Sequence, residues 1–274
     1  DLCKLADLEN YVAFIAGSDQ IWNATIHIEP IYFLRFAPKK KRIALAPSFG
    51  ITTIPNYNRR VVQKGLKGFD RIAVREKTGK KIVEQLCQVP TIQVVDPVFL
   101  LSREQWIRFA ENKNVPKGPY IFVHFLNRPK DQTIMEIEKL SKQLGAQVVC
   151  FSYEHQEYNK FENAVHIDGT PKDFVALIHD ARSVCTDSFH STVFSIMLHT
   201  EFYTFPRQHL HSVSQSSRIT DLLLHYRMDN RYLKSGKINK ESPIDWNIVD
   251  MIMEKDQFVL RKYLEEEIKR RGSK

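Results

Sequence analysis

Residues 183–198, SVCTDSFHSTVFSIML, decide the fold class, because they combine a short buried strand with a buried helix that follows it directly. Asp187 or Ser188 can cap this helix, whose apolar side chains include Phe189, Val193 and Ile196. A helix start at the carboxyl end of a strand presents N–H groups and a positive dipole end, which favour a phosphate or a carboxylate. The same field is expected to lower the pKa of His190 and keep it available as a base. A capped helix with an incidental histidine is the alternative.

The alternation of strand and helix extends outward from this junction along the whole chain. Apolar runs of strand length occur at 12–16, 43–46, 71–74, 92–95, 120–126, 147–151, 183–186 and 202–205. Segments with helical periodicity occur near 57–66, 78–86, 103–112, 132–144, 172–180, 189–198, 219–225 and 246–270. This order predicts an α/β protein whose parallel sheets are covered by helices on both faces.

A cluster of proline and glycine at residues 114–119 interrupts the alternation, as in a linker. We therefore expect a Rossmann-like N-terminal domain over residues 1–114 and a Rossmann-like C-terminal domain over 115–240. Residues 241–274 are expected to form a helix that packs back across the domains. The polar residues 208–217 suggest a mobile loop beside the site.

The composition is that of an ordinary globular protein: 274 residues with 43% hydrophobic and 26% charged side chains. The four cysteines form no Cys-x-x-Cys pair, and no apolar run approaches bilayer length, so we expect a cytoplasmic protein. The net charge of +8 suits anionic partners and allows peripheral contact with the inner face of a membrane. Nucleic-acid motifs are missing, so no nucleic acid is expected as a partner.

A second polar loop, GSDQIWN at residues 17–23, also follows a predicted strand. Gly17 permits a close approach of the backbone, and Trp22 offers a sugar ring a stacking surface. An ordinary turn with a buried tryptophan is the alternative.

Three further polar residues stand at strand ends or helix starts. Arg75 can hold a carboxylate or phosphate through two hydrogen bonds, or form an ion pair with a nearby acid. Asp96 is either an acid of the site or the start of a turn, and Arg218 is either a second phosphate ligand or a surface residue. The sequence contains no dinucleotide-binding, Walker or nucleophile-elbow motif, and its histidines show no metal-ligand spacing.

Taken together and in order, these segments resemble the polysaccharide pyruvyltransferase family. The segments that carry the likeness are 17–23, 72–76 (IAVRE), 96–101 (DPVFLL), 186–195 (TDSFHSTVFS), 217–224 and the closing helix from residue 243. The resemblance implies a glycosyltransferase-B-like architecture, in which two Rossmann-like halves face a cleft. It also implies transfer of a pyruvyl group from phosphoenolpyruvate to a sugar of a bacterial surface polysaccharide or its lipid-linked precursor.

The resemblance places the family's histidine at His190 and its donor-binding arginine region at Arg75. Several relatives carry an arginine where this chain has Ser188, so the contact of that arginine with a phosphate or carboxylate is either lost or supplied by Arg182, Arg207 or Arg218. Relatives also begin with a strand, a glycine-rich loop and a helix before residue 17, so an incomplete first domain is expected.

These arguments give one hypothesis for the site. The predicted catalytic residues are His190 as base, with Asp187 and Asp19 as acids, Asp96 being a further candidate. The predicted substrate contacts are Gly17, Ser18, Gln20, Trp22, Arg75, Asp96, Ser188, Ser191 and Arg218. No metal and no cofactor are expected beyond phosphoenolpyruvate as the donor. A glycosyltransferase that uses a nucleotide-sugar, or a catalytically idle saccharide-binding member of the family, is the alternative.

Overall fold

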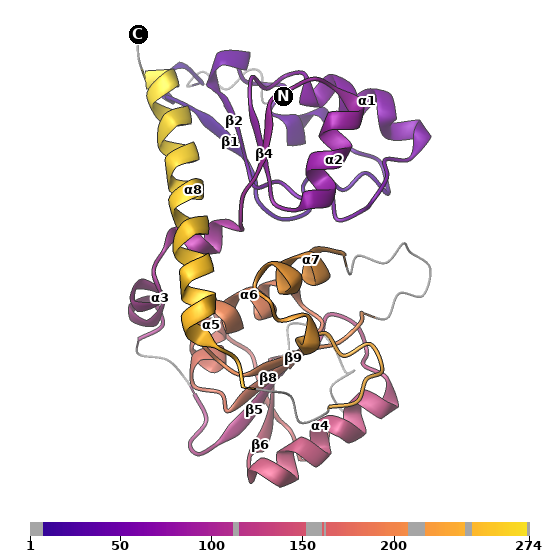
Figure 1. The fold of residues 1–274 in the computed structure, drawn as a ribbon, viewed down its shortest axis with the longest axis vertical. Helices are drawn as coiled ribbons and strands as arrows, with labels where there is room; N and C mark the ends of the chain where they lie inside the picture. Colours follow the sequence, from indigo (N-terminus) through magenta and orange to yellow (C-terminus); the bar gives the residue numbers. More distant parts are fainter. Residues whose placement is uncertain are drawn as a thin grey trace. The chain divides into compact units, whose positions relative to one another are not determined.

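The computed structural model describes residues 8–111, 115–151, 161, 163–207, 217–238 and 243–272. By its contacts the chain forms two compact units (Figure 1). Unit 1 contains the chain up to Leu100 and again from Ile252 onward, and unit 2 is Leu101–Met251. The domain limits expected from the sequence stay a prediction, because a division by contacts does not show which segments fold independently.

Unit 1 contains a four-stranded parallel sheet in the order β1-β2-β3-β4. The strands are β1 (Phe14–Ala16), β2 (Arg42–Leu45), β3 (Ile72–Val74) and β4 (Thr91–Gln93). The α-helices that begin and end in this unit are α1 (Asn56–Leu66) and α2 (Lys77–Leu86). Short 3₁₀ turns lie at η2 (Leu8–Asn10), η3 (Pro30–Phe33), η4 (Lys39–Lys41) and η5 (Pro97–Leu100).

The core of unit 1 is built around a cluster of aromatic side chains. Trp22 is fully buried, and its ring lies 5.4 Å from those of Phe33 and Phe49 and 5.7 Å from that of Phe69. Each of these rings comes from a different segment of the unit, so the cluster ties η3 to three loops. Fully burying such side chains is worth roughly 1.5–3 kcal/mol each.

Unit 2 contains a five-stranded parallel sheet in the order β7-β6-β5-β8-β9. The strands are β5 (Tyr120–His124), β6 (Gln147–Phe151), β7 (Val165–Ile167), β8 (Ser183–Thr186) and β9 (Phe202–Thr204). The chain first adds strands on one side of β5 and then crosses over to add β8 and β9 on the other. The carboxyl ends of β5 and β8 therefore form a topological switch point, where open α/β sheets bind their ligands.

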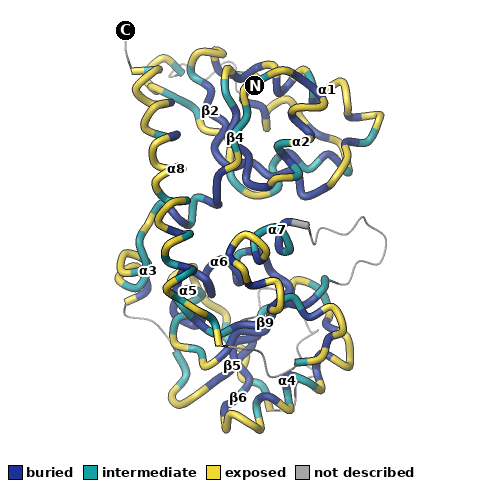
Figure 2. Tube along the Cα trace, viewed as in Figure 1, coloured by how far each residue is buried: buried dark blue, intermediate teal, exposed yellow. Residues whose placement is uncertain are grey.

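The helices of unit 2 are α3 (Arg103–Phe109), α4 (Asp131–Leu144), α5 (Pro171–His179), α6 (Phe189–Leu198) and α7 (Ser217–His225), with a 3₁₀ turn η7 (Asp229–Arg231). Helix α6 is buried at every position except His190, and its trace is mainly dark blue in Figure 2. It is therefore a central helix of the unit, and the direction of its start is set by the packing around it.

The long helix α8 (Trp246–Gly272) begins in unit 2 and continues in unit 1. Near its start the ring of Trp246 stacks on His199 at 4.6 Å, and Asp250 contacts His199 at 2.7 Å. Further along, the Tyr263 hydroxyl donates to the backbone oxygen of Ala44 in β2 at 3.0 Å.

The α/β class with two parallel sheets is confirmed, and every predicted strand and helix overlaps an observed element. One observed strand, β7 (Val165–Ile167), lies outside the predicted strand ranges, and the other differences are at the ends of elements. The first strand begins at Phe14 instead of residue 12, and β5 ends at His124 instead of residue 126. Of the predicted loop at 208–217, residues 208–216 lie outside the described residues, and Ser217 begins α7. No helix within the described ranges has the length and apolarity needed to cross a bilayer.

Candidate functional site

The carboxyl ends of β5 and β8 bring together side chains that are far apart in the sequence. His124 pairs with Thr186 in the register of these two strands, and the Thr186 hydroxyl donates to the backbone oxygen of His124. The turn from Asp187 to Ser191 follows at once and starts helix α6. Side chains from β5 and from two later segments of unit 2 contact this turn, so the strand–helix junction predicted from the sequence is the centre of a polar cluster.

Asp187 is almost completely buried in this turn, with 1% of its surface exposed. Its two carboxylate oxygens accept hydrogen bonds from the N–H of Leu126 at 2.7 Å and of Asn127 at 3.3 Å. Burial raises the pKa of Asp187 to about 6, although Arg207 and the two N–H groups oppose the shift. These contacts connect the loop after β5 to the start of α6.

His124 is a site residue that the sequence reasoning missed. Its Nδ1 lies 2.7 Å from the hydroxyl of Ser191 in the first turn of α6. Burial lowers the pKa of His124 to about 4, helped by the positive charge of Arg207, so its imidazole is neutral at pH 7. The apolar pattern continues to residue 126, which places His124 inside the predicted strand. If the predicted strand had ended at residue 124, His124 would have been recognised as a polar residue at the carboxyl end of a strand.

The predicted residues Ser188, His190 and Ser191 lie at the start of α6. His190 is the one partly exposed residue of α6, since the other nine are buried. The hydroxyl of Ser188 accepts from the N–H of Ser191 at 3.4 Å, which confirms Ser188 as the N-cap. Whether the helix start lowers the pKa of His190 stays a prediction.

Of the three arginines considered as substitutes at position 188, two reach this turn. Arg207 follows β9, with Nε 3.7 Å from the Asp187 carboxylate and Nη2 donating to the Asp187 backbone oxygen at 3.2 Å. Arg218, in α7, lies over the ring of Phe189 at 5.5 Å. Arg182 precedes β8 and is therefore at the amino end of that strand, away from the turn.

Unit 1 has a second polar cluster, also at the carboxyl edge of its sheet. Gly17 follows β1 with φ +153°, and a Cβ there would lie 1.8 Å from the backbone oxygen of Leu45, so only glycine fits. The hydroxyl of Ser18 donates to Asp96 at 3.1 Å. The turn that begins at Gly17 is thereby held against the residue that follows β4.

Arg75 lies at the centre of this second cluster, at the end of β3. It is 5% exposed, and its Nη1 donates to Asp96 at 2.7 Å while Nη2 donates to Asp19 at 3.2 Å. The side chain of Asp96 is 3% exposed, whereas that of Asp19 is 55% exposed. The structure thus shows the ion pair that was one of the two interpretations of Arg75.

Glu76 has a structural part in the same cluster. Its Oε1 accepts from the Ser48 hydroxyl at 3.0 Å and from the N–H of Phe49 at 2.9 Å. Burial raises the pKa of Glu76, against the opposing charge of Arg75. Glu76 therefore fixes the loop after β2. Gly50 of this loop lies against the side chain of Gln20, which belongs to the turn that begins at Gly17.

The interpretation of Trp22 as a sugar-stacking surface is wrong. Its indole is 0% exposed within the aromatic core, and its Nε1 donates to the backbone oxygen of Tyr32 at 2.9 Å. The alternative of a turn with a buried tryptophan applies. Gln20, the neighbouring candidate, is partly exposed and accepts from the Asn23 amide at 2.8 Å.

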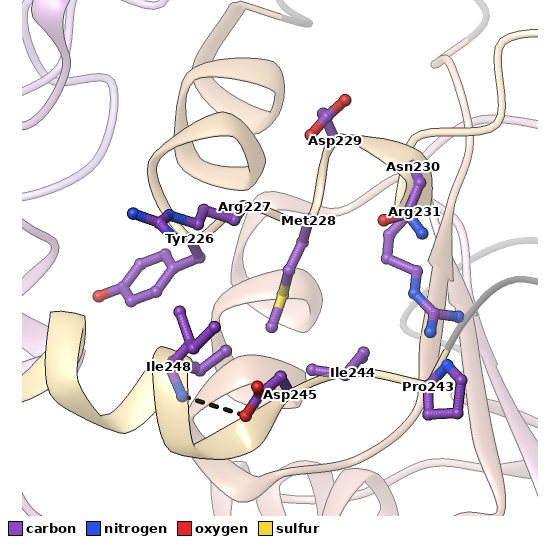
Figure 3. A pocket seen from close by; sticks show the side chains of 11 residues that line it. Tyr226, Arg227, Met228, Asp229, Asn230, Arg231, Pro243, Ile244, Asp245 and Ile248 are labelled. Carbon is purple, nitrogen blue, oxygen red and sulfur yellow. Dashed lines mark hydrogen bonds between the residues drawn. The ribbon is translucent and has the colours of Figure 1, made fainter.

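Two surface cavities lie outside the α6 turn. One, of about 450 Å³, opens beside Asp19 in unit 1 and extends to Tyr32. The other, of about 260 Å³, lies in unit 2 between η7 and the start of α8, with Met228 and Ile244 among its lining residues (Figure 3). In this second cavity Asp245 accepts from the N–H of Ile248 at 3.3 Å, so it serves to begin the helix. Among the described residues no group of three or more histidine, cysteine or acidic side chains is arranged to hold a metal.

Comparison with known proteins identifies one family. The sequence profile described as Polysaccharide pyruvyl transferase matches residues 1–209. No curated protein matches the sequence.

Solved structures show a broad likeness only. The chain is similar to UDP-GlcNAc 2-epimerase from Neisseria meningitidis, with 12% identity and a TM-score of 0.42, over 82% of this chain and 71% of that one. It is similar to the wall teichoic acid polymerase TagF with 11% identity and a TM-score of 0.39, over 84% of this chain and 65% of that one. The corresponding epimerase from Rickettsia bellii gives 10% identity and a TM-score of 0.41, over 86% and 70%. Likenesses at this level identify neither a substrate nor a reaction.

Proposed function

The chain belongs to the polysaccharide pyruvyl transferase family, and on this premise we propose that it transfers a pyruvyl group from phosphoenolpyruvate to two hydroxyls of a saccharide. The product is a cyclic ketal on a bacterial surface polysaccharide or its lipid-linked precursor. The assignment of the donor site rests on one observation. A neutral histidine and two arginines converge on the start of α6, at the switch point of the unit 2 sheet.

This end of α6 suits the donor because phosphoenolpyruvate carries a phosphate and a carboxylate. Helix starts favour anions, and arginine forms paired hydrogen bonds to both of these groups. Arg207 and Arg218 each contact the turn from Asp187 to Ser191. We assign these two arginines to the donor, in place of Arg75, whose guanidinium donates to two carboxylates, Asp96 and Asp19.

The reaction requires a base at the hydroxyl that attacks. In the first step the hydroxyl oxygen bonds to C2 of the enol ether, its proton leaves, and the methylene carbon gains a proton to become a methyl group. In the second step the other hydroxyl bonds to C2, the C2–O bond to phosphate breaks, and phosphate departs with one proton. His190, the one partly exposed side chain of α6, is proposed to take the hydroxyl proton.

Asp187 is proposed as a positioning residue and not as the acid that protonates the methylene carbon. Its side chain is 1% exposed, and its oxygens accept from the N–H of Leu126 and Asn127. Its contact with Arg207 holds that arginine beside the α6 turn. His124 acts in the same way on Ser191, at 2.7 Å.

The test is an assay of phosphate release coupled to mass spectrometry of the acceptor. The protein is incubated with phosphoenolpyruvate and a pool of lipid-linked saccharides, and a product heavier by one pyruvate less one water is expected. His190→Ala is expected to lower the rate by about 10²–10⁴-fold, the usual contribution of a general base. His166→Ala, an exposed histidine on β7, is the matched control and is expected to leave the rate unchanged.

Two outcomes would contradict the proposal. A product that gains a sugar from a nucleotide-sugar instead would identify a glycosyltransferase. A His190→Ala variant with wild-type turnover would show that another group is the base.

A further inference from the structure

We propose that the cavity beside Asp19 in unit 1 binds a neutral sugar ring, and that this ring belongs to the acceptor. The second half of this statement rests on the proposed function, whereas the first does not. The cavity has about 450 Å³, within the range of roughly 300–1,000 Å³ usual for small-ligand sites.

The lining of the cavity includes an aromatic residue whose backbone is held by the core. Tyr32 is 46% exposed and lines the cavity. It lies in η3, where its backbone oxygen accepts from the buried indole of Trp22 at 2.9 Å and the next residue, Phe33, stacks on that indole. A tyrosine ring has an apolar face and a polar tip, which suits the C–H face and the hydroxyl edge of a pyranose.

The lining of the cavity also includes polar groups of the kind that recognise sugar hydroxyls. The Asp19 carboxylate accepts from the buried Arg75 at 3.2 Å, while its side chain remains 55% exposed. The amide of Asn23 donates to Gln20 at 2.8 Å and accepts from the hydroxyl of Thr25 at 2.7 Å. A carboxylate held by Arg75 and two amides held by a hydrogen bond to each other lose less side-chain entropy when a ligand binds than free side chains would.

The charges around the cavity favour a neutral ligand over an anionic one. The arginine that contacts the lining residue Asp19 is Arg75, and its charge is shared between Asp96 and Asp19. The lining residue His27 pairs with Glu29 at 2.7 Å. An anionic sugar or a phosphate would meet the exposed carboxylate of Asp19, whereas a neutral sugar can donate its hydroxyls to it.

Saturation-transfer NMR on the full chain tests this site. The probes are methyl β-galactoside, methyl α-mannoside and methyl β-N-acetylglucosaminide, at high concentration because single sugars bind weakly. At least one probe is expected to receive saturation from the wild-type protein. Tyr32→Ala is expected to abolish the transfer, and Tyr32→Phe, which keeps the ring, is expected to preserve it.

Asp19 is tested by Asp19→Asn, because asparagine tolerates the left-handed backbone conformation at this position, where φ is 51°. The variant is expected to weaken binding about tenfold, as for loss of a hydrogen bond to a charged group. Tyr11→Ala, another exposed tyrosine of unit 1, is the control and is expected to bind as the wild type does. Thermal melts of each variant show that it is folded.

The outcomes separate this inference from the proposed function. If no probe receives saturation, or if Tyr32→Ala still does, the sugar site is wrong, whatever phosphoenolpyruvate does. If the probes bind as expected but phosphoenolpyruvate neither binds nor reacts, the sugar site stands and the pyruvyl donor is wrong.

Discussion

At the residue scale, the burial of Asp187 makes the stability of the folded protein depend on pH. The pKa of Asp187 is raised to about 6 in the folded protein, against about 3.9 in an unfolded chain. Between these values the folded protein holds a proton that the unfolded chain has released. The resulting stabilisation is therefore complete below about pH 4 and is lost as the pH rises through about 6.

We predict that Asp187→Asn removes this loss of stability. The free energy of unfolding of wild type and variant is measured by urea titration at intervals from pH 4 to pH 7. The difference in the free energy of unfolding between the two proteins should change by on the order of 3 kcal/mol across this range. Parallel profiles would show that Asp187 titrates normally.

His124 is predicted to have the opposite effect, although it lies at the same sheet edge. Its pKa is lowered to about 4, so between about pH 6.5 and 4 the unfolded chain binds a proton that the folded protein does not. Its contribution is present above about pH 6.5 and is lost as the pH falls toward 4. The same unfolding series on His124→Gln should show less loss of stability on acidification than the wild type, and an equal or greater loss would contradict this assignment.

Arg75 is predicted to stabilise unit 1 strongly. Both Arg75 and Asp96 are buried, and removing one partner of a buried pair typically costs 3–5 kcal/mol because a charge is left uncompensated. Arg75→Met should therefore lower the free energy of unfolding by about that amount, measured by denaturant titration. Arg59→Met on the exposed face of α1 is the control. Equal small losses in the two variants would mean that the buried pair contributes little.

At the scale of elements, the start of α6 combines a structural and a functional role. The Ser188 hydroxyl caps the helix, and the corresponding cap of α5 is Thr170, whose side chain accepts from the N–H of Asp173. Ser188→Ala and Thr170→Ala should each cost about 1 kcal/mol in unfolding experiments. The affinity for phosphoenolpyruvate should fall only in Ser188→Ala, and an equal effect of both variants on affinity would contradict a ligand role for this turn.

The elements themselves could be predicted because their signals are local. The apolar runs and helical periods lie within single segments, and so does the cap before α6. What the sequence could not supply are contacts that depend on register. His124 became a site residue only through its pairing with Thr186, and the burial of Trp22 depends on rings from three other segments.

The partners of Arg75 likewise could not be predicted from the sequence, because they depend on how the strands pair. The sequence left open whether Arg75 binds a ligand or forms an ion pair, since its partner Asp96 is 21 residues away. The contact depends on the parallel pairing of β3 with β4, which brings the ends of the two strands together. A pattern that reports one segment at a time contains no information on that pairing.

At the scale of the whole molecule, the two units carry different kinds of polar site. Unit 2 offers a helix start with Arg207 and Arg218, which suits an anionic donor. Unit 1 offers an exposed carboxylate and an aromatic ring, which suit a neutral saccharide. This difference in charge is the basis of the proposed division between donor and acceptor, and it can be tested one ligand at a time.

The most direct test of the donor is a thermal-shift titration with phosphoenolpyruvate beside UDP- and GDP-sugars. A ligand at 100 times its dissociation constant adds about 2.7 kcal/mol of stability. Phosphoenolpyruvate is expected to stabilise the wild type and the control Arg182→Ala, whose arginine lies at the amino end of β8. Stabilisation should be lost in Arg207→Ala. A wild-type protein stabilised by a nucleotide-sugar and not by phosphoenolpyruvate, or an Arg207→Ala variant that responds as the wild type does, would contradict the proposed donor site.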